Sequence, residues 1–308
     1  MDLTIFLPVA GTSVSVLVLL GLGGGVGFLS GLFGVGGGFL MTPLLMMIGV
    51  PPVVAAASDS NQIVAASTSG AYAHSRAGSV DFKMGTLLFG GGVAGGTVGV
   101  VLIKRLRELG NADFVIQITY VLMLGAIGTY MFFESLQGLR GRRPGPAAPG
   151  RPSLFSRIDA ALPWRTEFPR SGISLSPVMP LTLGALVGVL AAVMGVGGGF
   201  IMVPVMVYLL RMPMHVVVGT SLFQILFTCI HVTVLQSVLN HAVDVILALL
   251  LLAGSVVGAQ VGAKISRRLH ADHLKILMAA IVLAVMVKML LQLLMPPAAL
   301  VSYAGGHS

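Results

Sequence analysis

Charged residues and cysteine are scarce in this 308-residue sequence. Asp, Glu, Lys and Arg make up 9% of the chain and hydrophobic residues 56%, so too few polar groups are present to cover a soluble domain of this size. The one cysteine, Cys229, excludes an internal disulfide and a cysteine-rich metal site. The first fifteen residues contain no Lys or Arg, so the first apolar segment is expected to be a retained helix and not a cleaved signal peptide.

Several catalytic and nucleotide-binding motifs are also missing from the sequence. No Gly-x-x-x-x-Gly-Lys-Ser/Thr segment is present, and no Ser/His/Asp or paired-carboxylate set indicates an enzyme. We therefore expect neither catalysis nor a cofactor or metal. The net charge of +8 comes from Lys and Arg residues in short loops between apolar segments, a pattern typical of membrane topology and not of nucleic-acid binding.

Long apolar segments dominate what is present, and several reach the roughly 20 residues that a membrane-spanning helix needs. The sequence predicts an all-α polytopic membrane protein with 8–10 transmembrane segments in the lipid bilayer. Two of the segments, 39–50 and 199–210, are distinctly short. The segments are 12–33, 39–50, 53–73, 84–103, 114–134, 179–194, 199–210, 214–238, 243–263 and 274–295.

An internal repeat organises the chain into two homologous copies. The run Gly-Val-Gly-Gly-Gly-Phe at 34–39 reappears at 195–200, and the register then holds through Pro43 and Pro204. After a two-residue insertion, Val80-Asp81 matches Val243-Asp244. The predicted domains are a first repeat at 1–136, an Arg/Pro/Gly-rich linker at 137–178 and a second repeat at 179–308, each repeat with about five hydrophobic helices.

The positive-inside rule favours inverted copies. If the first two segments of each copy form a hairpin and the other three cross the bilayer, an outside N-terminus leaves only Lys104, Arg105 and Arg107 outside. Parallel copies would divide the basic residues almost evenly between the two sides. We therefore expect inverted repeats, with both termini and 104–107 outside.

The repeated glycine run predicts a helix break in each copy, because every glycine costs about 1 kcal/mol relative to alanine in a helix interior. In lipid, such a break is tolerated where it is buried or lines a polar cavity, and transporters build substrate sites in this way. The backbone N–H groups are candidates for binding an anion at the start of the short segments. A tight turn between packed helices is the structural alternative. The candidate residues are Gly36, Gly37, Gly38, Gly197, Gly198 and Gly199.

A polar cluster just downstream supplies the other candidates. Ser58, Asp59, Ser60 and Asn61 interrupt an apolar segment, and such groups should face the protein interior. The matching segment of the second copy keeps hydroxyl and amide groups but has no carboxylate. We predict that Asp59 carries a coupled proton and that the others hydrogen-bond the substrate, although interhelical hydrogen bonding is the plainer alternative. The second-copy candidates are Thr220, Ser221 and Gln224.

Two further patterns have structural interpretations. Glycines recur every four residues at 91, 95 and 99 and again at 254, 258 and 262, which predicts close helix packing. Asp81 and Asp244 each follow a valine at the start of an apolar segment, where a carboxylate caps a helix N-terminus.

Together, the repeated Gly-x-Gly-Gly-Gly-Phe, the prolines that follow it and Gly219-Thr220-Ser221 resemble the sulfite exporter TauE/SafE family over about 12–134 and 179–295. The resemblance implies a permease for sulfite or related organosulfur anions in a bacterial inner membrane, driven by an ion gradient. Two departures from the family pattern are Ser58-Asp59-Ser60 in the first copy and the long linker.

Two alternatives stay open at this point. A cation transporter would use Asp59 as a ligand, and a membrane scaffold would bind a protein partner through the arginine-rich linker. The sequence also leaves open the exact substrate, the direction of transport, the coupling ion and the oligomeric state, a homo-oligomer included.

Overall fold

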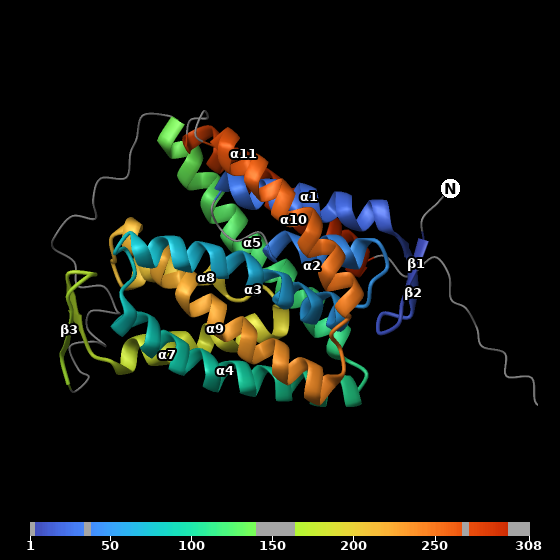
Figure 1. Cartoon of the computed structure of the whole chain (residues 1–308), viewed down its shortest axis with the longest axis horizontal. Helices are drawn as coiled ribbons and strands as arrows, with labels where there is room; N and C mark the ends of the chain where they lie inside the picture. The colour runs from blue at the N-terminus through green and yellow to red at the C-terminus, as the bar shows by residue number, and fades with distance from the viewer. Residues whose placement is uncertain (1–3, 34–37, 140–163, 267–270, 295–308) are drawn as a thin grey trace, which may run out of the picture.

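The computed structural model describes residues 4–33, 38–139, 164–266 and 271–294 as a bundle of helices that mostly share one long axis (Figure 1). Two short β-hairpins lie at opposite ends of this bundle. The all-α prediction is confirmed for the body of the protein, and the hairpins are the exception. The first-copy helices are α1 (Val16–Phe33), α2 (Gly38–Met47), α3 (Pro52–Arg76), α4 (Phe82–Glu108) and α5 (Ala112–Leu139).

The second copy repeats this order. Its second helix is short, because α8 passes after Pro204 into a π-helical turn, η1. Both segments predicted to be short are therefore short. The elements are α7 (Val178–Met194), α8 (Gly199–Pro204), η1 (Val205–Leu209), α9 (Met214–Asn240), α10 (Val245–Ser266) and α11 (Ala271–Leu294).

Within the described residues, α4, α5, α9, α10 and α11 contain stretches long and apolar enough to cross a membrane, and α1, α2 and α7 are shorter apolar helices. Helix α3 has 25 residues, but its polar cluster lowers its mean hydropathy. The number of crossings predicted from the sequence therefore depends on whether the shorter helices and α3 enter the bilayer.

Each copy begins with a hairpin that the sequence analysis did not anticipate. Strand β1 (Thr4–Leu7) pairs with β2 (Thr12–Ser15) before α1, and β3 (Thr166–Phe168) pairs with β4 (Ile173–Leu175) before α7. Gly11 and Gly172 make the turns with φ of 64° and 65°, a conformation that favours glycine. The alternation Thr-Ser-Val-Ser at 12–15 has the period of a strand, so α1 begins four residues later than the apolar segment predicted.

Each main packing contact joins a helix of the first copy to a helix of the second copy. Helix α1 packs mainly on α10, α7 on α4, α3 on α9 and α5 on α11. The close approaches fix the directions: Gly91, Gly95 and Gly99 of α4 meet Leu181, Ala185 and Val189 of α7 in ascending order, so this pair is parallel.

Three further sets of contacts extend this comparison. Gly23 and Gly27 of α1 meet Leu251 and Ser255 of α10, again parallel, whereas 63, 70 and 74 of α3 meet 225, 222 and 219 of α9, which is antiparallel. Gly125 and Gly128 of α5 meet 286 and 283 of α11, also antiparallel. The helices α3 and α9, and likewise α5 and α11, occupy equivalent places in the two copies and run in opposite directions.

The recurring glycines allow these helices to touch backbone to backbone. A Cβ added at Gly91 or Gly95 would lie 2.0 or 1.9 Å from the carbonyl oxygen of Leu181 or Ala185, and one at Gly254 or Gly258 would lie 2.4 or 2.0 Å from that of Leu20 or Gly24. A real side chain does not fit at these distances. The close packing predicted for these positions is confirmed.

We expect Gly27→Ala to destabilise the protein by about 1–3 kcal/mol or more, because the added methyl would lie 2.3 Å from the carbonyl oxygen of Ser255. Gly25→Ala is the matched control in the same helix, since nothing lies within 4 Å of its added Cβ. Thermal unfolding in detergent measures both. Equal melting temperatures for the two variants would contradict the predicted packing of α1 on α10.

Candidate functional site

The helix break predicted from the glycine run of the second copy is present. Helix α7 ends at Met194 and α8 begins at Gly199, and Gly195, Gly197 and Gly198 between them have φ of 71°, 66° and 77°. In the first copy α1 ends at Phe33 and α2 begins at Gly38. The predicted break of the first copy, with Gly36 and Gly37, lies outside the described residues.

The second-copy glycines also meet tight surroundings. A Cβ added at Gly195 would lie 2.0 Å from the carbonyl oxygen of Ala56, and one at Gly197 would lie 2.4 Å from Cys229 Sγ. Both the backbone conformation and the available space therefore require glycine at these positions, as expected for a tight turn between packed helices. That explanation leaves the functional one open, since a buried break still brings backbone groups to the centre of the protein.

The starts of α2 and α8 face each other across the centre of the protein. Phe39 and Phe200, which end the two glycine runs, stack with ring centroids 4.2 Å apart and planes 9° from parallel. Ile63 of α3 lies between the copies, because Cβ atoms added at Gly38 and Gly197 would lie 2.3 and 3.2 Å from its side chain. The starts of the two short helices therefore meet in one place.

Side chains from three other helices bind the carbonyl groups that the second break leaves without helical partners. Tyr120 of α5 donates its hydroxyl to Met194 O, Ser60 of α3 donates to Gly195 O at 3.1 Å, and Gln236 Nε2 of α9 donates to Ala192 O at 3.2 Å. A carbonyl at a helix end needs such a partner when water is excluded. Ser60, predicted to bind substrate, here stabilises the break.

Asp59 is fully buried beside the start of α2. Its Oδ2 accepts a hydrogen bond from Thr42 Oγ1 of α2 at 2.9 Å, and a Cβ added at Gly38 would lie 3.4 Å from the same oxygen. Its Oδ1 has no hydrogen-bond partner among the described residues, and no described cation forms an ion pair with it. Since Gly38 is the first residue of α2, the carboxyl group lies at a helix N-terminus.

The remaining candidate side chains differ in their hydrogen-bond partners. Ser58 Oγ accepts from Asp244 N at 3.1 Å, and Thr220 Oγ1 accepts from Asp81 N at 2.9 Å. Ser221 donates to Val218 O within its own helix. Asn61 is partly buried and forms no hydrogen bond with another described residue.

Two amide oxygens are buried near these groups without a partner among the described residues. Gln224 donates through Nε2 to Thr228 Oγ1 at 2.9 Å, but its Oε1 accepts no hydrogen bond. Gln62 Oε1 is in the same condition. With Asp59 Oδ1, the facing segments of α3 and α9 thus hold three buried oxygen atoms that can accept hydrogen bonds.

The two predicted caps are confirmed, and they also link the copies. Asp81 Oδ1 accepts from Met84 N and Asp244 Oδ1 from Leu247 N, both at 3.1 Å. Asp81 Oδ2 accepts from Ser171 Oγ at 2.5 Å beside β4, and Asp244 Oδ2 accepts from Val9 N at 3.1 Å between β1 and β2. Each aspartate therefore holds the hairpin that begins the other copy.

Sequence analysis missed several residues of this centre, Gln236 among them. Thr42 is a polar residue in an otherwise apolar short helix, a signal that could have placed it near Asp59. Phe39 and Phe200 were noticed only as part of the repeat. Nothing in the sequence distinguished Tyr120 from an ordinary buried aromatic residue.

Comparison with known proteins decides the family. The profile described as Sulfite exporter TauE/SafE matches residues 19–289. The chain belongs to the TauE/SafE family. This match includes both glycine runs, Asp59 and every described helix except the start of α1 and the end of α11.

Relatives of similar length support this assignment. "Probable membrane transporter protein YunE" of Bacillus subtilis is 27% identical over 283 residues, covering 89% of this chain and 96% of the relative. A "Probable membrane transporter protein" of Xylella fastidiosa (strain 9a5c) is 27% identical, covering 85% and 88%. "Probable membrane transporter protein YjnA" of Bacillus subtilis is 26% identical, covering 88% and 97%. No solved structure matches the chain.

We expect Tyr120→Phe to destabilise this TauE/SafE protein by about 1–3 kcal/mol, because it leaves the buried Met194 carbonyl unpaired. Tyr72→Phe is the control: Tyr72 is 64% exposed, and among the described residues its hydroxyl accepts a hydrogen bond from the exposed Arg76. Chemical denaturation in detergent compares the two. If Tyr120→Phe unfolds at the same denaturant concentration as Tyr72→Phe, the assigned role of Tyr120 is wrong.

Proposed function

We propose that this protein is a transporter that carries a small sulfur-containing anion, such as sulfite or an organosulfonate, across a bacterial inner membrane together with a proton. The observation that carries the proposal is Asp59, a buried carboxyl group at the start of α2 with one oxygen unpartnered among the described residues. The family and the names of its relatives support transport and not catalysis.

Inverted copies are part of this proposal. Equivalent helices α3 and α9, and α5 and α11, run in opposite directions, as an axis in the membrane plane would require. The distribution of Lys and Arg then places the N-terminus and 104–107 outside. In this arrangement the starts of α2 and α8, where Phe39 and Phe200 stack, lie near the middle of the bilayer, where alternating access needs its substrate site.

Helix electrostatics explains why a proton and an anion would be coupled. The N-terminus of α2 favours a negative charge, and an ionised Asp59 provides one. A substrate anion at the same place would be repelled by that carboxylate in surroundings that screen charge poorly. Protonation of Asp59 removes the repulsion, so the anion and the proton favour each other's binding.

The neighbouring polar groups would supply the hydrogen bonds to substrate oxygens. Ser58 and Thr220 accept bonds from backbone N–H groups, which leaves each hydroxyl hydrogen free to donate. Asn61 and Gln224 have amide donors, and Ser60 and Ser221 become available if their present bonds are exchanged. We assign the glycine N–H groups at 36–38 and 197–199 the same role.

A cation is the second candidate substrate, because the unpartnered Asp59 Oδ1 could also bind a positive ion. The two proposals differ in what removal of the charge does. An anion site loses its coupling but keeps substrate binding, whereas a cation site loses its principal ligand. The scaffold alternative concerns the linker, whose residues 140–163 lie outside the described part of the chain.

We expect Asp59→Asn to abolish the effect of a pH gradient on uptake of labelled sulfite or sulfoacetate into proteoliposomes while retaining substrate counterflow. The amide can still accept from Thr42 but cannot gain or lose the proton. Glu108→Gln is the control, since Glu108 forms an exposed ion pair with Arg105. Gradient-driven uptake that persists in Asp59→Asn would contradict the coupling role, and absence of anion flux in the folded wild type would contradict the substrate class.

A further inference from the structure

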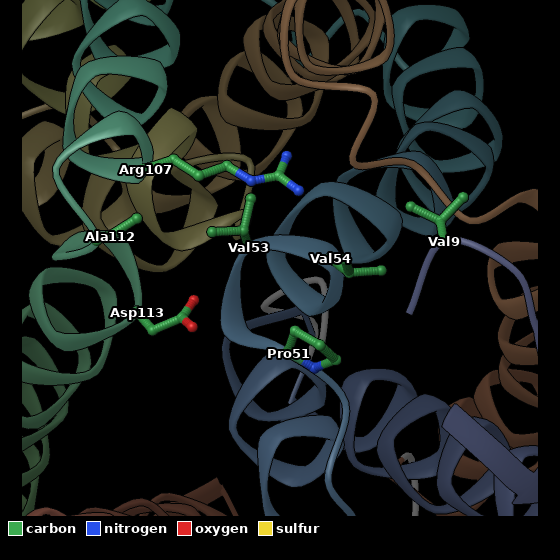
Figure 2. Close-up of a pocket in the computed structure, with 8 residues that line it drawn as sticks. Val9, Pro51, Val53, Val54, Arg107, Ala112 and Asp113 are labelled. Carbon is green, nitrogen blue, oxygen red and sulfur yellow. The ribbon is translucent and has the colours of Figure 1, made fainter. Parts of the chain in front are cut away.

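A cavity of about 220 Å³ opens at the end of the bundle that carries β1 and β2 (Figure 2). It lies where α4 ends and α3 and α5 begin, next to the turn of the first hairpin. This place is separate from the helix breaks. Its lining includes Val9, Val53, Val54, Arg107 and Asp113.

Two opposite charges, Arg107 and Asp113, line this cavity without forming an ion pair with each other. Arg107 Nη1 donates to Asn240 O at 2.6 Å, which fixes one edge of the guanidinium and leaves other N–H groups free. Asp113 lies in the first turn of α5. Neither forms an ion pair with a described residue, and Figure 2 shows them on two sides of Val53.

Helix α3 contributes residues both to the cavity and to the proposed central site. Val53 and Val54 are buried in the first turn of α3, and Asp59 follows Val53 by six residues, or about 9 Å along the helix. A ligand held in the cavity would therefore be separated from the central carboxyl group by less than two turns of α3. By the topology proposed above, this end of the bundle faces the outside.

We propose that this cavity binds a small zwitterion, with Arg107 taking a sulfonate group and Asp113 taking an ammonium group at the other end. The inference rests on the proposed function, because it makes the cavity the first binding place of a transported sulfonate. Guanidinium donates parallel hydrogen bonds to an oxyanion, and a free carboxylate accepts them from an ammonium group. The apolar side chain of Val53 suits the short carbon chain that joins the two groups.

The carboxylate makes the cavity selective. A ligand with only negative charge is attracted by Arg107 and repelled by Asp113, whereas a zwitterion of matching length satisfies both. A sulfonate that carries an amine should therefore bind more tightly than the same sulfonate without one. Arg107 governs affinity for both kinds of ligand, and Asp113 governs the difference between them.

Taurine and isethionate test this selectivity, because they share a sulfonate and a two-carbon chain and differ in an ammonium against a hydroxyl group. Equilibrium binding of each to the full-length protein in nanodiscs would be compared for wild type, Arg107→Gln and Asp113→Asn. Glu108→Gln is the control for a loss of surface charge next to Arg107. A thermal unfolding transition like that of the wild type confirms that each variant folds.

We expect wild type to bind taurine at least tenfold more tightly than isethionate. Asp113→Asn should weaken taurine binding about tenfold and leave isethionate unchanged or improved, and Arg107→Gln should weaken both about tenfold. Equal effects of Asp113→Asn on both ligands, no effect of Arg107→Gln, or equal affinity of wild type for both would overturn the proposal. Sulfite flux in the same preparations tests the proposed function separately, so a transporter with an unselective cavity is distinguishable from a protein that moves no anion.

Discussion

This structure depends on one constraint: where a helix stops inside a membrane protein, its last backbone groups need hydrogen-bond partners. Lipid provides no hydrogen bonds, so the carbonyl groups at the end of α7 must find partners within the protein. Tyr120, Ser60 and Gln236 supply them from three different helices. The break at Gly195–Gly199 thus fixes the positions of α3, α5 and α9 around it, and these helices carry or border the proposed site.

A second consequence is that the two copies depend on each other. Asp244 caps α10, holds the first hairpin through Val9 and donates its backbone N–H to Ser58, the neighbour of Asp59. Asp81 caps α4, holds the second hairpin through Ser171 and donates to Thr220, the position that matches Asp59 in the repeat. A shift of α3 or α9 must therefore break one of these bonds or carry a hairpin with it, which links the centre to both ends of the bundle.

The sequence predicted the parts of this arrangement that local chemistry determines. The repeat, the glycine break of the second copy, the short second helices, the close-packed glycines and the caps at Asp81 and Asp244 follow from residue type and spacing. The sequence could not show which helices would exchange partners, because glycine spacing does not name the facing helix. It therefore could not predict that Ser58 and Thr220 accept bonds from the caps, or that Thr42 binds Asp59.

The hairpins and Tyr120 were missed for different reasons. Residues 12–15 run without a Gly or Pro into the apolar segment that follows, and only their alternation indicates a strand. Tyr120 matters because its hydroxyl reaches Met194, 74 residues away in the chain, and no single-sequence pattern reports such a contact. The cavity beside Arg107 and Asp113 likewise exists only once the ends of three helices and a hairpin are assembled.

Proton uptake on substrate binding tests the central claim most directly. Purified protein in a weakly buffered solution with a pH indicator would receive a sulfonate that does not itself titrate near neutral pH. The account predicts that wild type takes up protons as the anion binds, approaching one per site, and that Asp59→Asn binds the anion with no proton uptake. Anion binding to wild type without proton uptake, or the same uptake in Asp59→Asn, would contradict it.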